Sequence, residues 1–172
     1  MSKTLRHLAA VAAVACAVIG TSMGARAQAG DKVLTRDDTP KLLADKVYYK
    51  GQSAPTQLRN SGGVKFADGY YVLATLVDTS GYSSDVQSKY QAYFISEVGL
   101  KIGGHNLPAG IYGIGFIGGD KFVVTDVGAH DVLSTTSTND AEMKRPMPLQ
   151  VTADPKGGFR LYAGRKYIHF SR

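Results

Sequence analysis

The chain has little of several residue types on which particular chemistries depend. Of its 172 residues one is a cysteine, Cys16, and none is a tryptophan. Cys16 lies near the amino terminus in a segment that we expect to be removed, which leaves the mature chain without a thiol. Thiol nucleophiles, thiolate metal sites and disulfides are then excluded. Any catalysis would fall to His, Ser, Asp, Glu, Lys or Tyr.

Long apolar runs are also scarce, and the one near the amino terminus is short. Leu8–Gly20 spans 13 residues, whereas a helix needs about 20 to cross the hydrocarbon core of a membrane. Lys3 and Arg6 precede this run, and small residues follow it, with an A-x-A pattern that ends at Ala27 and a second that ends at Ala29. A basic start, a short apolar middle and such an ending are typical of a secretory signal peptide.

We therefore predict a signal peptide over residues 1–29, cleaved at either of these two sites. A lipid anchor would require acylation of Cys16, but Ala17 and Val18 continue the apolar run where a polar tether should begin. The mature protein is expected to have no transmembrane span. Its predicted location is the periplasm or the extracellular space.

Charge of neither sign dominates the expected mature chain. Three of the 20 basic residues lie in the signal segment, which leaves 17 basic against 14 acidic residues. This mild excess favours solubility over a polyanion partner, and we predict no nucleic-acid partner. The excess is local, because Lys144–Arg172 holds seven basic residues and one acid, Asp154. We interpret this end as a solvated sheet face; the alternative is contact with an anionic envelope polymer through Arg165 and Lys166.

Sustained helical periodicity is nearly absent as well. Short apolar segments alternate with Gly and Pro turns through most of the chain, which is typical of antiparallel all-β proteins. We predict a single all-β domain over residues 30–172 with its core at about 45–172, built as an antiparallel β-sandwich or a partly closed β-barrel. A short helical segment is expected at Thr39–Leu43, with Thr39 as N-cap and Pro40 at the first helical position.

Runs of β-branched and aromatic residues place the individual strands. We predict strands at Lys46–Lys50, Gly69–Asp78, Gln91–Ser96, Leu100–Ile102, Ile111–Ile117, Phe122–Val127, Leu149–Ala153, Phe159–Ala163 and Tyr167–Phe170. Ser53–Gly63 and Ser134–Asp140 are polar and lack apolar periodicity, so loops are predicted there. Asp85–Ile95 carries both helical and strand spacing, and we favour a strand from about Gln91.

Glycines mark two further features of the middle of the chain. Gly113 and Gly115 lie two apart on one face of a predicted strand, which indicates close packing of a neighbour or a sharp bend, with packing favoured. Just before them, Leu107–Tyr112 reads Leu-Pro-Ala-Gly-Ile-Tyr. Together with its surroundings, Leu100–Gly119, this segment resembles the L-P-A-G-x-Y element of small exported bacterial β-sandwich domains, including uncharacterised families. The resemblance implies the fold class and no activity.

Motifs for catalysis are few. The sequence contains no G-x-S-x-G, no H-x-H and no H-x-x-x-H, and it has only two glutamates. One group of residues could carry chemistry: His130 would act as a general base or zinc ligand, oriented by Asp126 or Asp131. A hydrolase or metal-dependent enzyme centred on these three residues is thus the alternative function. We favour a structural histidine, and we predict no metal and no cofactor.

Tyrosine is the abundant aromatic residue, with ten copies. Tyr71, Tyr93, Tyr112 and Tyr167 fall in predicted strands and are our candidate ligand-binding residues. In a barrel such rings would line an interior able to hold a small apolar ligand, whereas in a sandwich they would fill the core. The sequence therefore favours a non-enzymatic exported binding or envelope-associated module for a small apolar ligand or an envelope partner.

Overall fold

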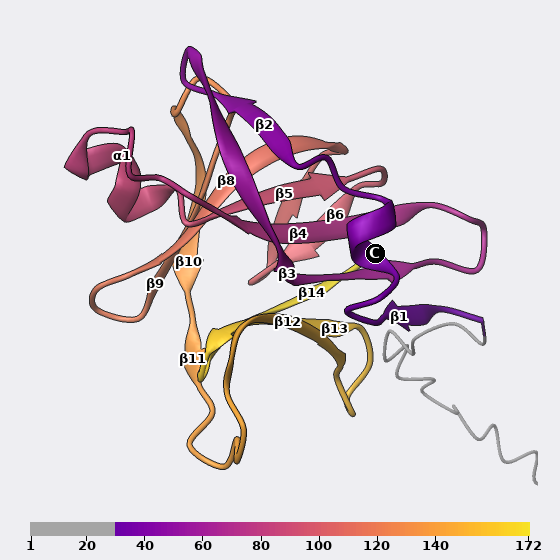
Figure 1. Cartoon of the computed structure of the whole chain (residues 1–172). Coiled ribbons are helices and arrows are strands. Elements are labelled where there is room, and N and C mark those ends of the chain that lie inside the picture. The colour runs from indigo at the N-terminus through magenta and orange to yellow at the C-terminus, as the bar shows by residue number, and fades with distance from the viewer. Residues whose placement is uncertain (1–29) are drawn as a thin grey trace, which may run out of the picture.

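The structure is a computed structural model that describes residues 30–172, and antiparallel strands make up most of it (Figure 1). The expected signal peptide, residues 1–29, lies outside the described residues. In the described part of the chain, fourteen strands form two sheets, one with eight strands and one with six. Within residues 30–172, no helix is long and apolar enough to cross a membrane.

The first sheet has the order β1-β3-β4-β5-β8-β9-β10, and β2 pairs with β3. Its strands are β1 (Lys32–Leu34), β2 (Lys46–Tyr49), β3 (Gln52–Lys65), β4 (Tyr71–Val77), β5 (Ala92–Ser96), β8 (Gly110–Ile117), β9 (Lys121–Thr125) and β10 (Asp131–Thr136). The second sheet has the order β12-β13-β14-β6-β7, and β11 pairs with β14. Its strands are β6 (Leu100–Ile102), β7 (His105–Leu107), β11 (Thr138–Asn139), β12 (Met147–Ala153), β13 (Phe159–Gly164) and β14 (Lys166–Ser171).

One large apolar core lies between the two sheets. Alternate residues along each strand point into it, because successive side chains of a strand leave opposite faces. The eight-stranded sheet contributes the buried Val72, Ala74, Phe94, Ile114, Phe122 and Val124, and the six-stranded sheet contributes the buried Leu149, Val151, Leu161, Ile168 and Phe170. The predicted antiparallel all-β fold is confirmed in its sandwich form, and the strands of residues 30–172 do not close into a barrel.

The predicted loop at Ser53–Gly63 is wrong, because this segment lies inside the longest strand, β3. Polar residues are tolerated there since most side chains of its first half are exposed or half-buried. The ladder of β3 with β4 shifts register between Gln57 and Ser61, and this irregularity contains the three residues Leu58, Arg59 and Asn60. After this irregularity the strand enters the core and also pairs with β1.

The predicted loop at Ser134–Asp140 is also wrong. Its first residues belong to β10, which pairs with β9, and Thr138–Asn139 form β11, which pairs with β14. β10 ends the strand order of its sheet, so it pairs on one side only and buries few side chains. A run of β-branched threonines suits such an edge strand without any apolar pattern. The chain thus crosses from one sheet to the other at Ser137.

The expected helical segment near the amino terminus is a single 3-10 turn, η1 (Thr39–Lys41), with Pro40 in its first turn. Asp38, not Thr39, is its N-cap residue. The Thr39 hydroxyl instead lies 2.6 Å from the Ser61 hydroxyl in a buried hydrogen bond. The ambiguous segment Asp85–Ile95 contains both periodicities in turn, since a short helix, α1 (Ser84–Lys89), is followed by β5.

Close packing explains the glycines singled out in the sequence. A Cβ on Gly113 would lie 2.7 Å from the Tyr49 ring and 2.8 Å from the Tyr90 ring, and a Cβ on Gly115 would lie within 2.4 Å of a backbone atom of Lys89. The favoured interpretation, a close neighbour at both glycines, is therefore confirmed.

The Leu-Pro-Ala-Gly-Ile-Tyr element has a physical reason as well. The Tyr112 hydroxyl donates a hydrogen bond to the carbonyl oxygen of Pro108 at 3.0 Å, which fixes the turn into β8. A Cβ on Gly110 would lie 2.8 Å from that same hydroxyl. The spacing of Pro, Gly and Tyr is thus set by a tyrosine ring that folds back over the turn.

A second apolar layer covers the outer face of the eight-stranded sheet. The hairpin of β2 and β3 reaches across to the β9–β10 turn, where the Lys50 amide donates to the Val127 carbonyl at 2.8 Å. Beneath it lies what we call the tyrosine cluster: Tyr49, Tyr82, Tyr90 and Tyr93, with Val47, Ala54 and Val77. The rings of Tyr49 and Tyr90 stack with centroids 3.6 Å apart.

Candidate functional site

Asp126 and His130 lie together in the turn between β9 and β10. Asp126 Oδ1 accepts hydrogen bonds from the amides of Gly128 (2.8 Å) and His130 (2.9 Å), and its Oδ2 lies 2.9 Å from His130 Nδ1. The backbone hydrogen bond from His130 and then its ring lower the pKa of Asp126. The histidine side chain is 78% exposed, so this pair closes a turn on the surface.

Asp131, the third residue of the predicted catalytic group, is engaged elsewhere. Its carboxylate accepts hydrogen bonds from Lys89 Nζ at 3.0 and 3.2 Å, which tie β10 to the end of α1. Within residues 30–172, no three His, Cys, Asp or Glu side chains come together as a metal site would require. The structure thus brings together Asp126 and His130 but directs Asp131 to a lysine.

The four tyrosines predicted to bind ligand occupy four separate surroundings. Tyr112 is buried in the core between the sheets, and Tyr93 belongs to the tyrosine cluster. Tyr71 lies at the edge of a small apolar group on the outer face of β4, with Lys65 Nζ 5.6 Å from its ring centre. Tyr167 lines a groove on the outer face of the six-stranded sheet.

This groove has a volume of about 500 Å³. One side is formed by β14, from Tyr167 to His169, together with Arg160 of β13. The turn Asp154–Gly157, Gly103 and two threonines, Thr136 and Thr138, complete it. The chain crosses between the sheets at Ser137, and this crossing brings Thr136 of the eight-stranded sheet beside the outer face of the six-stranded sheet.

Arg160 and Asp154 form an ion pair at the groove. Arg160 Nε donates to Asp154 Oδ2 at 2.7 Å, and Nη2 donates to Oδ1 at 3.3 Å. Asp154 Oδ1 also accepts the Lys156 amide at 2.9 Å, and the Asp154 side chain is only 6% exposed. Desolvation raises the pKa of Asp154, but the hydrogen bonds from Arg160 and Lys156 outweigh it and the net shift is downward. Hydrogen bonds to Asp154 and then Tyr162 raise the pKa of Arg160.

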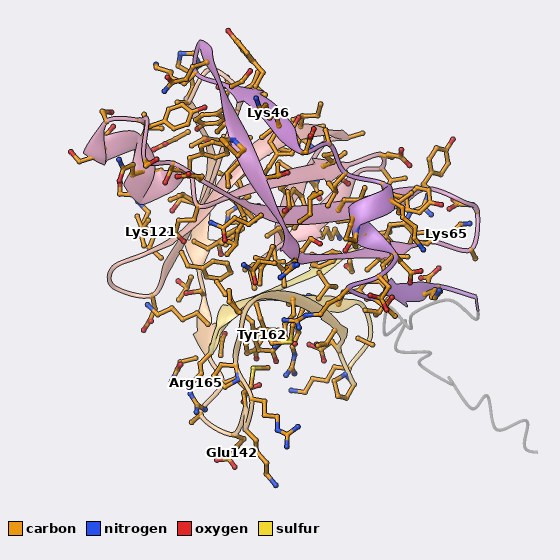
Figure 2. All side chains as sticks on the ribbon, viewed as in Figure 1. Lys46, Lys65, Lys121, Glu142, Tyr162 and Arg165 are labelled. Atoms are coloured by element: carbon orange, nitrogen blue, oxygen red, sulfur yellow. The ribbon has the colours of Figure 1, made fainter. Side chains whose placement is uncertain are left out.

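Aromatic rings pack against the guanidinium of Arg160. The guanidinium carbon of Arg160 lies 4.5 Å from the centre of the Tyr167 ring, and the Tyr162 and Tyr167 ring centres are 5.0 Å apart. The Tyr162 hydroxyl accepts from Arg160 Nη1 at 3.3 Å and donates to Asp140 Oδ2 at 2.9 Å. Figure 2 places Tyr162 on the strands at the lower side of the molecule, away from Lys46. The guanidinium is thus held in one orientation.

Three other basic side chains of the carboxyl-terminal segment form ion pairs or hydrogen bonds with residues of the same chain. Lys166 Nζ pairs with Asp120 at 3.1 Å and Arg172 pairs with Asp68 at 2.6 Å. Arg165 donates to the carbonyls of Ala141 and Met143 in the loop before β12. Arg165 and Lys166, the residues of the alternative in which this segment contacts an anionic polymer, therefore already have partners.

The sequence analysis named Tyr167, which lines the groove, but it did not name Arg160 or Asp154. The signal that could have found Arg160 is the alternation in β13, where Phe159 and Leu161 face the core and Arg160 and Tyr162 must face outward. Asp154 opens the Asp-Pro-Lys-Gly-Gly turn, and a turn that joins two paired strands places its first residue near the start of the next strand.

The chain matches no protein-family model, and comparison with curated proteins and with solved structures finds no match. The function must therefore be argued from the site itself.

Proposed function

We propose that this protein is an exported, non-enzymatic binding module whose ligand occupies the groove on the outer face of the six-stranded sheet. The observation that supports this proposal is the groove of about 500 Å³, whose lining includes the Arg160–Asp154 ion pair. Small-molecule sites are concave, largely preformed and equipped with a few oriented polar groups. A guanidinium held by a carboxylate, a hydroxyl and an aromatic face is oriented in this sense before any ligand arrives.

Export rests on the signal-like segment at the amino terminus. A sandwich with one continuous core gives a rigid face on which such a groove can be presented. The enzymatic alternative at Asp126, His130 and Asp131 has less support, because His130 is exposed and Asp131 pairs with Lys89. A general base needs a reacting group held beside it, and an open turn holds none.

Native mass spectrometry of the protein recovered after export tests the proposal. Thr136→Trp should fill the groove, since Thr136 is exposed and lines it. Ser134→Trp is the matched control, because Ser134 is exposed two residues earlier on the same strand and is not part of the groove lining. We expect an extra mass on the wild type and on Ser134→Trp that is absent from Thr136→Trp.

A second measurement covers a ligand that is lost on purification. Binding to the native state must raise the apparent stability, so a panel of saccharides, lipids and organic anions should include a compound that raises the melting temperature of the wild type but not of Thr136→Trp. If nothing is retained and no compound separates the two proteins, the proposal is wrong.

A further inference from the structure

We propose that the groove recognises an oxyanion, a carboxylate or phosphoryl group carried by a small ligand, through Lys156 and Arg160. This inference rests on the proposed function and adds the chemical class of the ligand. The groove combines hydrogen-bond donors on its surface with a carboxylate whose acceptor sites are already used.

Arg160 has donors left after its own contacts. A guanidinium carries five N–H groups, and three of them are used: Nε and Nη2 to Asp154, and Nη1 to Tyr162. One N–H on each terminal nitrogen therefore has no hydrogen-bond partner among residues 30–172. Asp140 lies 4.0 Å from Nη1, which is beyond hydrogen-bond distance, and it does not line the groove.

Lys156 adds positive charge that nothing nearby balances. Its side chain is exposed in the turn after β12, and no carboxylate of the described residues pairs with its ammonium. The charge of Arg160, in contrast, is balanced by Asp154. Lys156 therefore gives this groove its excess of positive charge.

The acceptors near the groove are mostly occupied. Asp154 accepts three hydrogen bonds and is almost fully covered. The Gly157 carbonyl accepts from His169 Nε2 at 2.8 Å. The lining groups left to face a ligand include the N–H groups of Arg160, the ammonium of Lys156 and the hydroxyls of Thr136, Thr138 and Tyr167, with the Nδ1 of His169 beside them. Donors in this number match a ligand group that only accepts, and an arginine fork suits the oxygens of a carboxylate or phosphoryl group.

Three probes with one common body test the class of ligand. Galactose is neutral, galacturonic acid replaces its terminal hydroxymethyl group by a carboxylate, and galactose 6-phosphate carries a phosphoryl group at the same position. At low salt, we expect at least one of the two anionic probes to bind at least tenfold more tightly than galactose. The anionic probe that binds more tightly identifies whether the ligand carries a carboxylate or a phosphoryl group. Added salt should weaken that binding.

Lys156→Gln and Lys46→Gln form the matched pair of variants. Both lysines are exposed, and Lys46 lies on β2 of the other sheet, far from Tyr162 in Figure 2. We expect about a three- to tenfold loss of affinity for the anionic probe in Lys156→Gln, since one charged donor is removed, and no change in Lys46→Gln.

The inference is overturned if galactose binds as tightly as both anionic probes, if Lys156→Gln behaves like Lys46→Gln, or if no probe binds. The proposed function would survive each of these results if native mass spectrometry finds a neutral compound bound to the wild type and absent from Thr136→Trp. The two failures are therefore distinguishable.

Discussion

The hydroxyl of Tyr90 offers a quantitative test of the packing on the outer face of the eight-stranded sheet. Tyr90 is 0% exposed, and its hydroxyl has no hydrogen-bond partner among residues 30–172. A buried polar group without a partner costs about 1–3 kcal/mol. Because phenylalanine lacks this group and keeps the stacked ring, we expect Tyr90→Phe to raise the free energy of unfolding by about 1 kcal/mol.

Tyr49→Phe is the matched control, since its ring stacks on that of Tyr90 and is 1% exposed. Its hydroxyl shares a 2.6 Å hydrogen bond with the Thr125 hydroxyl, so its removal should lower the free energy of unfolding by about 1 kcal/mol. The two variants remove the same atom from neighbouring rings and should differ by about 2 kcal/mol. Without tryptophan in the chain, urea unfolding followed by far-ultraviolet circular dichroism is the appropriate assay.

The result that refutes this reasoning is a loss of stability in Tyr90→Phe similar to that in Tyr49→Phe. Such a loss would mean that the Tyr90 hydroxyl does have a partner in solution, and the description of the tyrosine cluster would have to change.

Three further predictions concern pH and packing. Burial raises the pKa of Tyr90 above its ordinary value of 10.0, so above pH 10 the unfolded chain loses the Tyr90 proton before the folded protein does. The free energy of unfolding should then fall by up to about 1.4 kcal/mol per pH unit for this group. The fall should be less steep in Tyr90→Phe. Gly113→Ala should cost about 2 kcal/mol in urea unfolding through overpacking, whereas Gly118→Ala, with open space around its Cβ, should cost far less. The pKa of Asp154 is lowered in the folded protein. Its stabilising contribution is therefore present above the pKa of about 3.9 in the unfolded chain and is lost as the pH falls through the pKa in the folded protein. Asp154→Asn should be less stable than the wild type at pH 7, and its free energy of unfolding should fall less on acidification.

Sequence patterns were sufficient for the parts of the fold that depend on local apolar density. The strands β8 and β9 were predicted because Ile111–Ile117 and Phe122–Val127 are rich in β-branched and aromatic residues. β3 and β10 were missed for one reason: each is held by backbone pairing with a neighbour, while many of its own side chains stay exposed. Pairing with the neighbouring strands β9, β2 and β4 decides such strands, and the apolar pattern of the segment itself does not reveal this pairing.

The site shows the same limit. Tyr167 was predicted as a ligand-binding residue from its strand position alone, but most other groove residues come from outside β14: from β10, β11, β13, the β6–β7 turn and the Asp154–Gly157 turn. Sequence spacing does not reveal that these segments meet, because they meet only after β10 and β11 cross between the sheets. Asp126 and His130 could be paired from sequence, since a single turn holds both.

The location of the ligand is the central claim, and amide chemical shifts test it most directly. The ¹⁵N-labelled mature protein should be titrated with the compound that stabilises it best, and the amide shifts followed residue by residue. We expect the large changes to fall on β13, β14 and the Asp154–Gly157 turn. Changes centred instead on the Asp126–Asp131 turn or on the tyrosine cluster would contradict the assignment of the groove as the binding site.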